Sequence, residues 1–288
     1  MTPPRLAGGW DDAIWAAAPA LHVDQFHPRG SDHRPIVRAK VLYDAGGLYV
    51  IFDVRDRYVQ CLQTQPQSMV CGDSCVEFFV EPRPRAGYFN FEINCGGTPL
   101  VHYNTPGGGG AAHGRADAPV GSGADAPVGS LQSHYNTPGG GGSARGPESS
   151  HEGHQGQEET PVTRRGAQPE GTPTGAPDVR DPGSEEDKRI RPISADLLGQ
   201  LRIYHSLPQL VQPERPEAVN WRIEYFIPLA LFERYLGCLG DLAGQTWRGN
   251  FCKCADRTSH PHWATWAPIG TELDFHQPRY FGTLRFAG

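Results

Sequence analysis

Short segments of alternating apolar and polar residues, separated by Gly- and Pro-rich turns, recur along this chain. One pair, residues 36–44 and 48–54, flanks a turn in which Gly46 and Gly47 supply the positive φ angles that tight hairpin loops need. The same alternation returns at residues 75–81, 88–95, 221–227 and 247–254. A period of two indicates strands with one buried face. Several short strands of this kind predict an all-β fold, an antiparallel β-sandwich.

Only short helices are expected between these strands. Residues 228–236 form a candidate helix, because Pro228 suits a first helical turn and Gly237 suits its end. Leucines at 197, 198 and 201 indicate one further turn. Residues 10–18 form an amphipathic turn that could hold the N-terminal segment against the body of the protein.

The composition changes abruptly between Asn104 and Arg189. This segment contains no Trp, Phe, Cys, Ile or Met and about half of the chain's 36 glycines. It also carries two duplications: residues 102–110 recur at 134–142, and residues 116–122 recur at 124–130. Such a segment buries too little apolar surface to offset the entropy of ordering it. We therefore predict a disordered insert at 104–189 within one sandwich domain, formed by 1–103 plus 190–288.

The region from Trp247 to Pro268 holds the richest set of side chains. Its first part alternates as a strand, and from Asp256 onward it becomes a polar loop that contains His262, Trp263 and Trp266. A loop that contains two indoles and is bracketed by prolines is not expected to form another strand after the first. The two indoles suit a flat aromatic surface on which a sugar ring could stack. The alternative, that both indoles fill the end of the sandwich core, is equally open from the sequence.

Charge and cysteine content narrow the class of protein. The net charge of −6, without a long basic run, gives no reason to expect a nucleic-acid partner. No apolar run is long enough to span a bilayer, so no membrane partner is expected. The start lacks a signal-peptide pattern, which predicts a cytoplasmic protein as written, or a secreted one if the start is truncated. The spacing of the seven cysteines is not that of a zinc ribbon and predicts free, partly buried thiols.

Five segments, in this order, resemble a known family. They are residues 42–50, 72–80, 88–94, 221–228 and 281–286. Together they resemble the family 9 carbohydrate-binding modules, within the wider DOMON-like β-sandwich group. The resemblance implies a non-catalytic module that binds a mono- or oligosaccharide, is associated with polysaccharide breakdown and glycoside hydrolases, and holds structural calcium. We expect such a module to be a monomer.

The resemblance also implies site residues. Glu77 matches the family's acidic strand position, and Asn90 and Glu92 lie on the neighbouring strand. Trp263 or Trp266 takes the role of the stacking aromatic. Apart from the resemblance, the place of His262 beside Trp263 suits a hydrogen-bond donor to a sugar hydroxyl. The family's second stacking aromatic has no counterpart here, because residues 65–71 contain no aromatic residue. One-sided stacking, or loss of sugar binding, is therefore expected in place of a two-sided clamp.

Carboxylates at strand ends suggest a calcium site. Asp53, Asp56 and Asp73 are the candidate ligands, and solvated turn residues are the alternative. Asp73 and Glu77 make a poor glycosidase pair, since residues four apart on a strand lie about 13 Å apart.

Enzymatic alternatives centre on the same C-terminal region. A hydrolase of glycosidic bonds, or a metal-dependent enzyme using His260, His262 and His276, is the competing function. A haem protein is less favoured, because only Met1 or Met69 could supply a methionine ligand.

Overall fold

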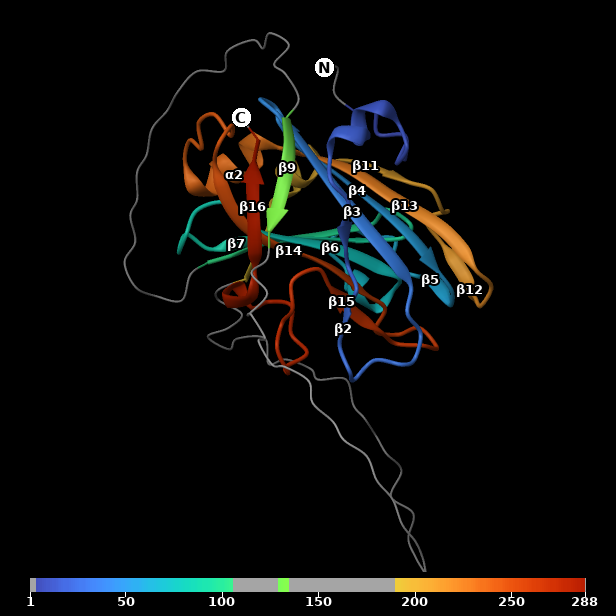
Figure 1. Cartoon of the computed structure of the whole chain (residues 1–288). Helices are drawn as coiled ribbons and strands as arrows, with labels where there is room; N and C mark the ends of the chain where they lie inside the picture. Colours follow the sequence, from blue (N-terminus) through green and yellow to red (C-terminus); the bar gives the residue numbers. More distant parts are fainter. Residues whose placement is uncertain (1–3, 106–128, 135–189, 288) are drawn as a thin grey trace, which may run out of the picture.

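The protein is an all-β sandwich of antiparallel strands with a few short helices, as the alternation predicts (Figure 1). The structure is a computed structural model that describes residues 4–105, 129–134 and 190–287. Its helical segments are η1 (Ala13–Ala17), η2 (Val70–Gly72), α1 (Ala195–Leu198), α2 (Leu229–Leu236) and η3 (Pro278–Tyr280). Within the described ranges, none of the helices has the length and apolar character of a membrane span.

One layer is built around the predicted hairpin. Its strands are β1 (Leu21–His22), β3 (Ile36–Asp44), β4 (Gly47–Asp56), β13 (Val219–Pro228) and β11 (Arg202–His205). β3 and β4 pair in register from Ile36↔Arg55 to Asp44↔Gly47, which confirms the hairpin. Gly47 is required here: a Cβ at this position would lie 2.0 Å from the carbonyl oxygen of Ile227.

The second layer carries the C-terminal region. Its strands run in the order β10 (Ile190–Pro192), β8 (Pro99–Asn104), β7 (Tyr88–Asn94), β6 (Cys75–Glu81), β14 (Thr246–Cys254) and β16 (Gly282–Phe286). β15 (Trp263–Thr265) pairs with the end of β14 and with β2 (Gln25–Phe26). A separate two-stranded sheet joins β5 (Val59–Cys61) to β12 (Val211–Arg215).

The core lies between the two layers and contains the inward-facing residues of the alternating segments. Its largest fully buried members include Trp221, Trp247, Phe52, Phe78 and Phe251. Both outer faces are also covered. The N-terminal segment packs Trp10 and Trp15 on the first layer, and the C-terminal loop packs Phe275 and Phe281 on the second. The N-terminal turn is further held by Glu224, which accepts hydrogen bonds from the Gly8 amide at 2.6 Å and the Trp15 indole at 3.3 Å.

Two segments for which the sequence analysis argued against a strand each contain one. The prediction that the loop with the two tryptophans forms no strand is wrong at Trp263–Thr265, because β14 and β2 supply partners on both sides. Part of the predicted insert is also ordered: β9 (Gly129–His134) pairs with β16 and β3 and joins the two layers (Figure 1). The rest of the predicted insert, 106–128 and 135–189, lies outside the described residues.

The register of β8 and β10 brings the two ends of this long segment together. Asn104 is the direct antiparallel partner of Ile190, so a tight turn could join the two strands. We predict that replacing residues 105–189 by a short turn leaves a folded β protein. Shortening the loop by about four doublings recovers about 2.5 kcal/mol of closure entropy, which offsets part of the loss of β9.

Urea unfolding followed by circular dichroism measures the outcome. A chain that keeps residues 129–134 but shortens 135–189 is the matched control. Loss of cooperative unfolding in the first variant alone would show that β9 is indispensable to the sandwich.

Candidate functional site

A pocket of about 500 Å³ lies on the outer face of the second layer, beneath the C-terminal loop. The strand alternation that turns Phe78 and Phe251 into the core turns Glu77, Glu92 and Cys254 outward into this pocket. The loop that covers it contributes residues 273–276. The remaining lining residues are Met69, Cys71, Leu100, His102, Ile190, Pro192, Asp256 and Trp263.

Trp263 lies half-buried in the wall of the pocket. The pairing of β15 with β14 sets it opposite Cys254, and its indole Nε1 donates to the Asp256 carboxylate at 2.7 Å. The His27 amide donates to the Trp263 carbonyl oxygen at 2.8 Å and fixes the backbone on the other side. The ring is thus anchored at its edge while part of its surface borders the pocket, a geometry that suits stacking on an apolar ring face.

Two carboxylates face each other on neighbouring strands of the pocket. Glu77 and Glu92 are direct partners in the β6–β7 register, and both are nearly fully buried. Burial, followed by the charge of Asp256, raises the pKa of Glu92 to about 7. Burial and then the neighbouring Glu92 also raise the pKa of Glu77. The pair can therefore accept hydrogen bonds from hydroxyl groups or hold a proton of its own.

Asn90 does not line the pocket but orients one of these carboxylates. Its side-chain amide donates to Glu92 Oε1 at 2.8 Å, and its own carbonyl accepts from Asn104 Nδ2 at 2.7 Å. Asn90 is completely buried, so direct contact with a ligand would require it to move.

Residues 65–71, where the family's second stacking aromatic has no counterpart, do contribute to the pocket. It supplies Met69 and Cys71 and no aromatic ring. On the C-terminal loop, His276 and Phe275 line the pocket, and His276 Nδ1 is 3.0 Å from the hydroxyl of Tyr88. Sequence reasoning named His276 only as a candidate metal ligand and assigned no sugar-binding role to this loop, because it has no periodic pattern. The clustering of Phe275 and His276 was the one available signal.

Trp266 and His262 do not line the pocket. Trp266 is 4% exposed and packs in the core against Phe251, with ring centroids 5.9 Å apart. A Cβ on Gly282 would lie 2.3 Å from its ring. Of the two positions left open by the sequence, Trp263 therefore lines the pocket and Trp266 packs in the core.

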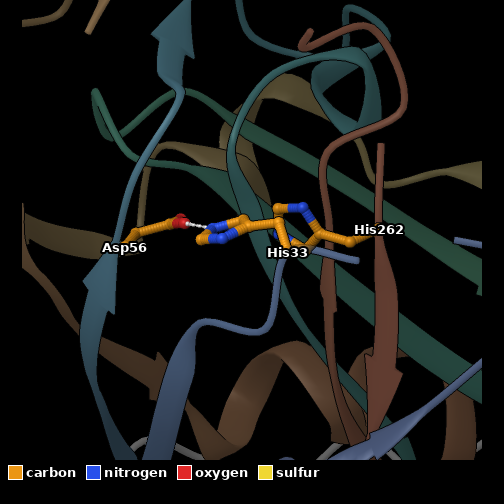
Figure 2. A group of neighbouring side chains, drawn as sticks. All are labelled: His33, Asp56 and His262. Atoms are coloured by element: carbon orange, nitrogen blue, oxygen red, sulfur yellow. Dashed lines mark hydrogen bonds and ion pairs between the residues drawn. The ribbon is translucent and has the colours of Figure 1, made fainter. Parts of the chain in front are cut away.

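His262 belongs to a buried polar cluster at one end of the core, which we define as Lys253, Asp56, His262 and His33. Figure 2 shows three of its members: His33 bonds to Asp56 at 2.7 Å while His262 lies beside it. Lys253 is fully buried, and its Nζ lies 3.4 Å from Asp56 Oδ2 and 2.9 Å from His262 Nε2. Since His262 Nδ1 lies 2.9 Å from the carbonyl oxygen of His260 and donates to it, Nε2 is the acceptor for the lysine.

The protonation states within the buried polar cluster follow from burial and charge. Burial and the Lys253 ammonium lower the pKa of His262 to about 3. Burial alone would raise the pKa of Asp56, but Lys253 and His33 hold it well below its usual range. At neutral pH the cluster therefore contains an ionised Asp56 and a neutral His262 imidazole.

The three candidate calcium ligands do not converge in the described part of the chain. Asp53 pairs with Arg38 at 2.7 Å and Arg222 at 2.6 Å. Asp73 accepts from the Leu62 and Gln63 amides, both at 2.9 Å. Asp56 lies in the buried polar cluster. Calcium binding stays a prediction from the resemblance.

The sequence profile described as Carbohydrate-binding family 9 matches residues 14–121 and 177–286. The chain therefore belongs to this family, which confirms the resemblance. No curated protein matches the sequence significantly.

Three solved structures are similar to this chain, and the first of them supports the same fold. A candidate carbohydrate-binding protein from Bacteroides uniformis ATCC 8492 is similar at 22% identity and a TM-score of 0.60, covering 94% of this chain and 87% of that one. A family 9 module from Caldicellulosiruptor kristjanssonii, solved in complex with glucose, is 11% identical with a TM-score of 0.46 and coverage of 98% and 91%. The structure of that module in complex with cellotriose is 12% identical, with a TM-score of 0.48, and the match covers 100% of this chain and 91% of that one.

Truncation of the two tryptophans should destabilise the protein by unequal amounts. Trp266→Ala should lower the free energy of unfolding by about 3–5 kcal/mol, because it empties a large buried site. Trp263→Ala, at the half-exposed position, should cost about 1 kcal/mol. Urea denaturation of both variants measures the difference. Equal destabilisation would contradict the assignment of Trp263 to the pocket and Trp266 to the core.

His262→Gln should change how stability depends on pH. Because the pKa of His262 is lowered from 6.5 to about 3 on folding, protonation favours the unfolded chain, and stability is lost as the pH falls below 6.5. A neutral glutamine removes this loss, which amounts to at most about 1.4 kcal/mol per pH unit. Chemical denaturation of both proteins between pH 7 and pH 4 should therefore show a smaller decline for the variant. Parallel declines would contradict a neutral, buried His262.

Proposed function

We propose that the protein is a non-catalytic carbohydrate-binding module associated with polysaccharide breakdown. In this proposal a sugar ring stacks on Trp263 while its hydroxyls donate to Glu77 and Glu92. The observation that carries the proposal is that an anchored, half-exposed indole and two buried carboxylates share one pocket. Membership of carbohydrate-binding family 9 points in the same direction.

The dimensions and chemistry of the pocket support a small saccharide. Its volume of about 500 Å³ lies within the range of sites that enclose small molecules. A sugar has an apolar C–H face for the indole and hydroxyl donors for the carboxylates. Stacking is one-sided, because no second aromatic lies in the segment that supplies Met69 and Cys71.

A glycoside hydrolase is the second candidate function. The specific observation in its favour is that Glu77 and Glu92 are adjacent and that burial raises the pKa of Glu92 to about 7. A carboxyl group that stays protonated near neutral pH can serve as a general acid. Incubation with oligosaccharides tests this: release of reducing sugar that is lost in Glu92→Gln would favour the enzyme over the binding module.

A glycan array should first identify the sugar, and titration calorimetry should then compare variants. Glu77→Gln removes one charged acceptor and should weaken binding about 10- to 100-fold, in keeping with a hydrogen bond to a charged group of about 1.5–3 kcal/mol. Glu81→Gln is the matched control. Glu81 also faces outward from β6 but lies outside the pocket and bonds to the Arg85 amide.

Equal losses in the two variants would contradict the role of Glu77. Repeating the titration with a chelator tests the calcium prediction. A module with structural calcium should lose stability, and with it binding, when the ion is removed.

A further inference from the structure

We propose that the wall of the pocket contains a site for a thiophilic divalent cation, of which Zn²⁺ is the representative, formed by Cys75, Cys254 and Glu77. One potential ligand atom from each of these side chains lies within 4.8 Å of the other two. The site shares Glu77 with the proposed sugar-binding pocket, but its test by metal titration requires no sugar.

The strand register brings the three side chains together. Cys75 is the direct partner of Cys254 in the β6–β14 pairing, and Glu77 lies two residues further along β6, on the same outward face. Cys254 Sγ lies 2.9 Å from Glu77 Oε1. Three ligands thus come from two rigid, paired strands, which hold their relative positions before any ion binds.

The donor set matches zinc and its chemical relatives. Zinc binds cysteine sulfur at about 2.3 Å and carboxylate oxygen at about 2.0–2.2 Å in tetrahedral sites, which places neighbouring ligand atoms about 3.6–3.8 Å apart. Small side-chain movements suffice to reach this spacing. Binding replaces the two thiol protons and any proton held by Glu77, all of which pass to solvent, so the thiolates and the Glu77 carboxylate together provide three negative charges for the ion.

The surroundings favour a cation. The pocket is also lined by the carboxylates of Glu92, Asp256 and Asp274, and no lysine or arginine lies among its described lining residues. The nearest buried ammonium, that of Lys253, faces the opposite side of β14 and is engaged with Asp56 and His262. A bound divalent ion would offset this concentration of acidic groups.

The ion would have one position open to the pocket. Cys254 and Glu77 line the pocket, whereas Cys75 lies behind them. Three protein ligands leave a fourth tetrahedral position for water or a ligand oxygen, as in zinc sites that are accessible to small molecules.

A second group with the same spacing is His33, Asp56 and His262. There the Lys253 ammonium already contacts both Asp56 and His262, at 3.4 and 2.9 Å. It contains no sulfur, so spectroscopy distinguishes the two groups.

Titration of the reduced protein with Co²⁺ alone tests the proposal. We expect one equivalent to bind with the near-ultraviolet charge-transfer absorption of cobalt–thiolate bonds. That absorption should be lost in Cys254→Ser and in Cys75→Ser, and Glu77→Gln should weaken binding at least 10-fold. Cys238→Ser, at an exposed thiol, and His262→Gln are matched controls that should bind as the parent does.

Because Cys75 is fully buried, its variant could fail to fold, so a measurement on the unaltered protein is needed too. X-ray absorption at the zinc edge should show two sulfur neighbours at about 2.3 Å and oxygen at about 2.0–2.2 Å. The proposal is overturned by cobalt binding without the thiolate absorption, by loss of binding in His262→Gln or Cys238→Ser, or by a zinc shell without two sulfurs.

Discussion

The register between β6 and β14 determines both the core and the pocket. It sets Phe78 opposite Phe251, with stacked rings 4.7 Å apart on the inner face, and it sets Cys75 opposite Cys254 on the outer face. A slip of one residue would exchange the two faces and bury the acidic and thiol groups in the core. The requirement to bury the aromatic rings therefore also fixes which polar groups reach the pocket.

The same strand contains Lys253, which faces the core and connects the pocket to the opposite side of the sheet. Lys253 holds His262 on the inner side, and the next residue, Trp263, faces the pocket. Removing one partner from a buried charged pair leaves the other without compensation, at a cost of about 3–5 kcal/mol. The buried polar cluster thereby anchors the strand that carries the indole.

The sequence predicted those parts of the structure that depend on local patterns. The β3–β4 hairpin and the neighbouring strands β6 and β7 follow from alternation alone. The same alternation puts Glu77 and Glu92 on the polar face of their strands. β9 was missed because its partners β16 and β3 are distant in the chain. β15 was missed because its three residues follow a polar, proline-containing loop and its second partner, β2, is also distant. β9 has the sequence Gly-Ser-Leu-Gln-Ser-His, with a single apolar residue. The cysteine spacing likewise concealed Cys75 and Cys254, which are far apart in the chain and are brought together only by the register.

The anchoring of Trp263 has a consequence for the thermodynamics of recognition. A side chain that is free in solution loses rotamer freedom when a ligand immobilises it, at about 0.5–1.5 kcal/mol. The hydrogen bond to Asp256 and the pairing of β15 on both edges restrict this indole in advance. Most of that entropic cost is incurred during folding, so differences in affinity between ligands should reflect the contacts that each ligand makes with a preorganised surface.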